Sequence, residues 1–151
     1  MSLKDWLSNG WLVEHKTSPQ EIEDLISLAD RDLRNATVSG LDPEWQLIMA
    51  YNADLRLAAA PLAAAGYRSS REGSHYRIIN SLALTIGADR EMINKFDAFR
   101  KKRNLSQYDH AGLVSEKEFE EMKELAFELK YRVKTWLKIN YPELLPEDKK
   151  N

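Results

Sequence analysis

The sequence has no cysteine among its 151 residues. Disulfide bonds and thiolate metal sites are therefore excluded, and nothing in the composition indicates secretion. No apolar run approaches the ~20 residues that a membrane-spanning helix needs. The N-terminal stretch is broken by Asp5, Asn9 and Gly10, unlike a signal peptide. We therefore expect a cytoplasmic, prokaryotic protein that does not associate with a membrane.

Glycine and proline are scarce, and most of them stand where helices are expected to begin or end. The sequence has 6 glycines and 5 prolines. Pro19 and Pro43 each follow a residue that can cap a helix, and proline is favoured at the first helical position. Gly40, Gly66 and Gly87 follow segments whose apolar residues recur at helical spacing. These positions divide the chain into helices.

The composition is that of a soluble globular domain, with 43% hydrophobic and 30% charged residues. The fold class that the pattern predicts is all-α, an up-and-down bundle of about five helices. Helices are expected over the segments 19–39, 43–65, 75–86, 90–104 and 116–141.

The bundle is expected to span residues 18–141. Residues 1–17 are expected to be an extension that packs on the bundle, and residues 142–151 a polar tail that frays. The segment 77–86 also has the pattern of a strand, although Asn80 and the glycine stop after it favour a helix.

The small net charge of −2 hides an uneven distribution along the chain. Residues 1–65 are acidic, with 5 Lys/Arg and 10 Asp/Glu. Residues 66–103 are basic, with 9 Lys/Arg and 4 Asp/Glu. Residues 104–151 are slightly acidic, with 8 Lys/Arg and 10 Asp/Glu. Two interpretations of this basic middle segment stay open. It forms a surface patch for a polyanion, or it packs against the two acidic segments in a near-neutral monomer.

The stretch RKKRNLSQYDH contains an inward-facing arginine and a histidine on one helix face. Met92, Phe96 and Phe99 form an apolar stripe at steps of four and three, and Arg103 continues it. His110 lies two turns further on, about 10.5 Å along an ideal helix axis. The two side chains are too far apart to bond each other, but both can reach one phosphodiester.

Simpler interpretations of the same stretch are also open. Arg100, Lys101 and Lys102 form a solvated helix end whose cations complement the helix dipole. Arg103 pairs with an acidic residue of a neighbouring helix, in a purely structural module. His110 then ends a helix without any chemical role.

Arg103, Asn104 and a histidine after six intervening residues, in the penultimate helix, resemble the motif of the HEPN superfamily. The block EWQLIMAYNADLRLAAAPLAAAGYRSSREGSHYRIINSLALTIG also resembles a prokaryotic HEPN subgroup, in which an Ala-rich helix precedes Gly-Tyr-Arg and a histidine. The resemblance covers roughly residues 20–140.

The resemblance implies a helical bundle that forms a homodimer, with the arginine and histidine in a cleft between protomers. It implies a ribonuclease that needs no metal or cofactor, often a toxin paired with a nucleotidyltransferase antitoxin. Arg103 is then the phosphate clamp, because guanidinium binds phosphate bidentately. His110 transfers a proton, and Asn104 orients the substrate or the arginine.

Further residues are expected to contact RNA. Arg100, Lys101 and Lys102 supply non-specific attraction to the phosphate backbone. Tyr108 occupies the place of the histidine in the commoner form of the motif. This departure leaves an alternative function open, a non-catalytic dimeric scaffold that binds a nucleotidyltransferase or RNA.

Arg71 and His75 form a second polar group with Arg77 beside a basic loop, and are expected to line the same cleft. A histidine that merely starts a helix is the simpler interpretation of His75. The three histidines of the chain do not have the spacing of metal ligands.

Overall fold

The computed structural model describes residues 1–71, 74–108 and 114–145, without the side chains of residues 105–108. Four long helices dominate the described chain. The elements in chain order are α1 (Leu3–Ser8), β1 (Leu12–Glu14), α2 (Pro19–Ala36), α3 (Pro43–Ala64), β2 (Tyr67–Ser69), α4 (Ser74–Ser81), α5 (Arg90–Tyr108), α6 (Glu116–Asn140) and the 3-10 turn η1 (Pro142–Leu144).

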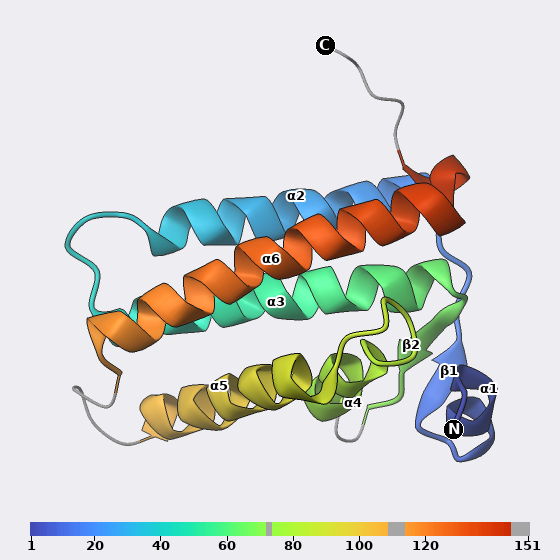
Figure 1. Ribbon diagram of the computed structural model, residues 1–151, viewed down its shortest axis with the longest axis horizontal. Helices are drawn as coiled ribbons and strands as arrows, with labels where there is room; N and C mark the ends of the chain where they lie inside the picture. The colour runs from blue at the N-terminus through green and yellow to red at the C-terminus, as the bar shows by residue number, and fades with distance from the viewer. Residues whose placement is uncertain (72–73, 109–113, 146–151) are drawn as a thin grey trace, which may run out of the picture.

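The long helices run alternately in opposite directions, as Figure 1 shows. α2, α3 and α6 lie side by side, and α5 lies across from them with the short α4 at its beginning. The prediction of an all-α, up-and-down bundle is confirmed. None of the described helices has both the length and the apolar character needed to span a bilayer.

Local capping explains where the long helices begin. The Ser18 hydroxyl accepts a hydrogen bond from the backbone N–H of Glu21 at 3.1 Å, and Pro19 occupies the first helical position. At the start of α6, Ser115 and Glu118 form the reciprocal bonds of a capping box. Both helix starts were predicted from these residues.

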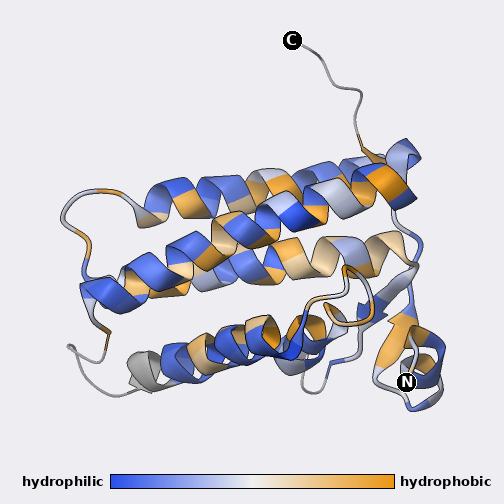
Figure 2. Ribbon diagram, in the orientation of Figure 1, coloured by the Kyte–Doolittle hydropathy of each residue, from blue (hydrophilic) through white to orange (hydrophobic). Residues whose placement is uncertain are grey.

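The core is centred on α3, which is packed on more than one side. Its alanines, including Ala50, Ala53 and Ala60, have no exposed surface, and their small side chains let α2 and α6 approach closely. Figure 2 shows hydrophobic and hydrophilic residues alternating along the surrounding helices, as in amphipathic helices that bury one face. A polar side chain on such a buried helix costs free energy unless it is hydrogen-bonded, so each one needs an explanation.

The N-terminal segment forms a small unit with β2, which the sequence did not predict. β1 pairs antiparallel with β2, with Leu12 opposite Ser69. A second apolar cluster joins this unit to the bundle through Trp6, Leu12 and Leu62. The Arg77 guanidinium carbon lies 3.8 Å from the ring centre of Trp11, so α4 is also tied to this unit.

Two further segments differ from expectation. α4 ends at Ser81 rather than near Gly87, because the chain continues in tight turns in which Leu82 and Ala83 bond carbonyls only three residues back. Beyond α6, Leu144 and Leu145 pack against the core instead of fraying. The remaining residues of the expected polar tail, 146–151, lie outside the described residues.

Candidate functional site

Arg103 continues the buried face of α5. Met92 and Phe96 on this face are 5% and 1% exposed, and Phe99 packs partly buried against the same core. Arg103 itself is half-buried, and its Nε atom is enclosed without a hydrogen-bond partner. Its Nη1 atom lies 3.3 Å from Oδ1 of Asn104. The apolar stripe therefore ends in a guanidinium that faces the bundle.

Side chains from two other helices meet Arg103. Its guanidinium carbon lies 5.6 Å from the ring centre of Tyr51 on α3, within cation–π range. The Tyr51 ring is fully buried, and its hydroxyl oxygen lies 3.3 Å from Nδ1 of His75 on α4. Together with Arg100, these residues form what we call the Arg103 cluster: Tyr51, His75, Arg100 and Arg103.

The cluster sets the charge state of its two titratable rings. Burial raises the pKa of Tyr51 above its usual range, although Arg100 and Arg103 oppose this shift. Burial lowers the pKa of His75 from its ordinary value of 6.5, and the positive charges of Arg103 and Arg100 lower it further. Near neutral pH the site therefore holds a neutral phenol and a neutral imidazole beside two cations.

The Arg100 side chain extends from α5 and lies against Tyr76 of α4. Its Nε atom donates to Oδ1 of Asp97 at 2.7 Å, and its guanidinium carbon lies 5.7 Å from the ring centre of Tyr76. The sequence favoured a solvated helix end here, but the Arg100 side chain is only 22% exposed. Asp97, one turn earlier, holds it against the bundle. Tyr76 remains 44% exposed at the rim of the cluster.

The other predicted RNA-binding cations lie outside the cluster. Lys101 is 69% exposed and lies 3.5 Å from Asp97, and Lys102 lies 3.1 Å from Glu118 at the start of α6. Arg71 is exposed after β2, and no contact described in the structure joins it to the cluster. Lys101 and Lys102 are thus each balanced by a nearby carboxylate.

Two predicted residues are not placed by the structure. α5 extends to Tyr108, further than the sequence predicted, but the side chain of Tyr108 is not described. His110 lies outside the described residues. Among the described residues, the histidine in the Arg103 cluster is therefore His75 of α4.

Asp54 is a polar residue that the sequence interpretation missed. It lies one turn after Tyr51 on α3, is 3% exposed, and neither carboxyl oxygen has a hydrogen-bond partner. Burial raises its pKa well above the ordinary value of 3.8, because burial favours the neutral carboxyl over the carboxylate. A single carboxylate in the Ala- and Leu-rich second half of this helix was the available signal.

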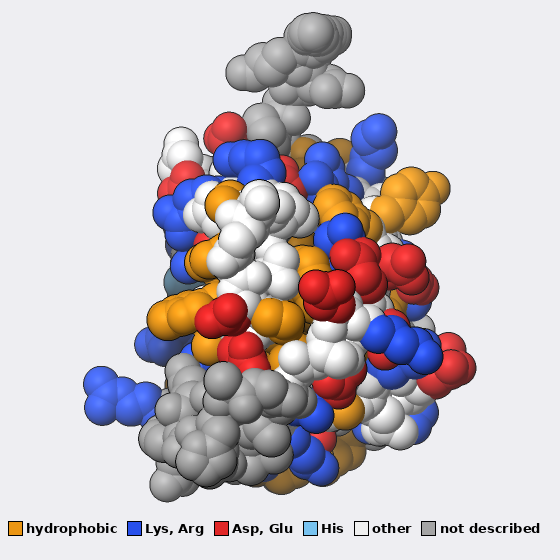
Figure 3. All heavy atoms as spheres, turned by 90° about the vertical axis from the view of Figure 1, so that its left-hand side faces the viewer, with side chains coloured by type: hydrophobic (Ala, Val, Ile, Leu, Met, Phe, Trp, Pro, Cys, Tyr) orange, Lys and Arg blue, Asp and Glu red, His pale blue; other side chains and the backbone are white. Residues whose placement is uncertain are grey.

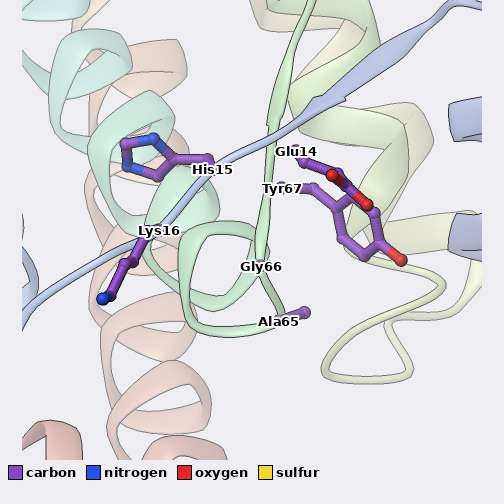
Figure 4. Close-up of a pocket in the computed structure, with 6 residues that line it drawn as sticks. All are labelled: Glu14, His15, Lys16, Ala65, Gly66 and Tyr67. Carbon is purple, nitrogen blue, oxygen red and sulfur yellow. The ribbon is translucent and has the colours of Figure 1, made fainter.

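An open hollow elsewhere on the protein does not share any residue with the cluster. Its volume is about 520 Å³, and Figure 4 shows Glu14 and Tyr67 on one side of the strand and His15 and Lys16 on the other. The His15 ring is already bonded to Glu21 at 2.8 Å. The polar groups of the hollow therefore do not converge on one point.

One end of the bundle carries charges of both signs, and no metal centre is evident in the described part of the chain. There, no three His, Asp or Glu side chains are grouped to hold a metal ion. Figure 3 shows acidic, basic and apolar side chains interspersed on one end of the bundle. On that described face, charge does not gather as it does on a broad polyanion-binding surface.

Comparison of the chain with protein-family models, with curated proteins and with solved structures gives no match. The Arg103 cluster and the motif that contains Arg103 are therefore the features that bear on function.

Proposed function

We propose that this protein binds RNA and cleaves it at the Arg103 cluster, as a HEPN-like ribonuclease. One observation carries the proposal. Arg103 is a half-buried cation at the meeting point of three helices, and no carboxylate of the described residues is in ion-pair distance of it. A structural arginine in this position would be expected to have such a partner.

A phosphodiester fits the cluster by charge and by hydrogen bonding. A guanidinium offers parallel donors to two oxygens of one phosphate group. Arg103 is half-buried without a carboxylate partner among the described residues, and Arg100 adds a second positive charge to the cluster. During cleavage these cations would stabilise the charge that grows on the phosphate oxygens.

The motif resemblance extends the proposal to the biological setting. It supports a cytoplasmic toxin that acts as a homodimer and is neutralised by a small nucleotidyltransferase. The resemblance also supports cleavage that needs no added metal. The dimer is tested by sedimentation of the purified protein, where a strictly monomeric protein would contradict that part of the proposal.

The central test is cleavage of cellular RNA by the purified protein in the presence of a metal chelator. Arg103→Ala is expected to lower the cleavage rate by about 10²–10³-fold, the usual effect of removing one group that stabilises a transition-state charge. Arg34→Ala is the matched control, because Arg34 is an exposed arginine on α2. It should cut at the rate of the unchanged protein.

Each alternative gives a different result. Equal cleavage by the unchanged protein and by Arg103→Ala would reject the proposal. RNA binding that is lost in Arg103→Ala, without cleavage by either protein, would indicate the non-catalytic scaffold instead.

A further inference from the structure

His75 and Arg103 contact the same tyrosine. The Tyr51 hydroxyl lies 3.3 Å from His75 Nδ1, and the Tyr51 ring lies under the Arg103 guanidinium at 5.6 Å. Tyr51 is fully buried, whereas His75 and Arg103 are each half-buried. The buried ring thus holds a histidine and an arginine from two different helices beside each other.

His75 differs from the other described histidine in what surrounds it. His15 is bonded to a carboxylate, Glu21. His75 bonds a neutral hydroxyl, and the charges that act on its ring are the cations Arg103 and Arg100. An imidazole in this setting remains available as a neutral proton acceptor.

We infer that His75 is the catalytic base of the Arg103 site, and that the substrate is RNA with a free ribose 2′-hydroxyl. This inference rests on the ribonuclease function proposed above. It assigns the proton transfer to a residue on α4 and not to His110, the histidine of the motif.

The inferred role requires one tautomer of His75. In it, Nδ1 carries the hydrogen and donates it to the Tyr51 oxygen 3.3 Å away, which leaves the lone pair of Nε2 free. The raised pKa of Tyr51 keeps its own proton in place, so the phenol does not compete as the base. Tyr51 is therefore a positioning residue.

The reaction is a transesterification at phosphorus. His75 Nε2 takes the proton of the 2′-hydroxyl, the bond from O2′ to phosphorus forms, and the bond from phosphorus to O5′ breaks. O5′ takes a proton from solvent water, and the hydroxide formed takes the proton from His75. The products are a 2′,3′-cyclic phosphate and a 5′-hydroxyl end, while Arg103 neutralises the phosphate oxygens.

The charged and titratable groups around His75 set its pH dependence. Tyr51 faces it from α3, Arg100 and Arg103 act on it from α5, and Asp97 is the partner of Arg100. Because the two cations lower the pKa of His75, the base is active at neutral pH and is lost as the pH falls through that lowered value. The cleavage rate should therefore rise with pH along this limb and then level off.

The test compares His75→Ala and His75→Gln with the control His15→Ala on an RNA oligonucleotide, with melting curves to show that each variant is folded. Both His75 variants should lose about 10²–10⁴-fold in cleavage rate, and binding of the 2′-deoxy oligonucleotide should change less than twofold. His15→Ala should cut at the rate of the unchanged protein, because His15 is bonded to Glu21 and lies outside the Arg103 cluster. Normal cleavage by a folded His75 variant, with Arg103→Ala inactive, would overturn this inference alone.

A second measurement uses the pH profile. Arg100→Gln removes a positive charge that lowers the pKa of His75, so the acid limb of the cleavage profile should move to higher pH. An unmoved limb would reject His75 as the base. If Arg103→Ala cuts as fast as the unchanged protein, or the unchanged protein does not cut, the proposed ribonuclease function fails and this inference fails with it.

Discussion

The raised pKa of Asp54 should make the stability of the protein depend on pH in a way that one substitution removes. Asp54→Asn keeps the size and polarity of the side chain but cannot ionise. Asp54 is buried without a hydrogen-bond partner, which raises its pKa in the folded state above the ordinary 3.8. The unfolded chain releases this proton at a lower pH than the folded protein does.

The sign of the effect follows from this difference. Below pH 3.8 Asp54 is protonated in both states, so it makes no pH-dependent contribution. Above that pH the unfolded state gains from ionisation while the folded state does not. The folded protein should therefore lose about 1.4 kcal/mol of unfolding free energy for each pH unit up to the folded pKa. Asp54→Asn should not show this loss.

The assay is urea unfolding of both proteins at pH 4, 5, 6 and 7, followed by circular dichroism. The difference in unfolding free energy should grow with pH in favour of Asp54→Asn. Asp24→Asn, at an exposed position on α2, is the matched control and should give a difference that is flat with pH. Parallel pH curves for Asp54→Asn and the unchanged protein would show that the carboxyl is not buried and neutral.

Three other predictions concern packing and binding. Phe96→Ala should lower the unfolding free energy by about 3–5 kcal/mol in urea unfolding, because the ring is 1% exposed; a loss below about 1 kcal/mol would contradict its place in the core. Arg77→Ala should lower the unfolding free energy by about 0.5–2 kcal/mol, because the contact with Trp11 is lost. In a protein that already carries Trp11→Leu, adding Arg77→Ala should change the unfolding free energy very little. Tyr76→Ala should weaken binding of single-stranded RNA in a fluorescence titration by about 1–3 kcal/mol, as for a base-stacking ring, whereas Tyr131→Ala on α6, also exposed, should not.

The long helices were predictable because their determinants are local. The Ser18 and Ser115 caps, with Pro19 and Pro43 at first helical positions, act within one turn of sequence. The strands β1 and β2 were missed because each has only three residues, and they exist through pairing between segments more than fifty residues apart. Such short strands leave almost no periodic pattern.

The candidate site was predictable only along α5. Met92 and Phe96 form a buried stripe, and helical steps of three and four from them reach Arg103. Helical periodicity therefore predicts which face of α5 carries Arg103, because it depends on α5 alone. The contact of Tyr51 with His75 joins residues 24 positions apart, and no local pattern specifies it. The sequence placed His75 near the cleft through its basic neighbours, but not against the tyrosine that positions it.

The N-terminal unit gives the bundle an unexpected dependence on its first residues. α4 has 8 residues, too few to be stable alone. Arg77, two residues after His75, is packed against Trp11, and β1 pairs with the strand that leads toward α4. The orientation of His75 is thus governed from the opposite side of α4 by a tryptophan in the first dozen residues. A deletion at that end is therefore expected to shift His75 relative to the long helices, and it would also uncover Leu62 on α3.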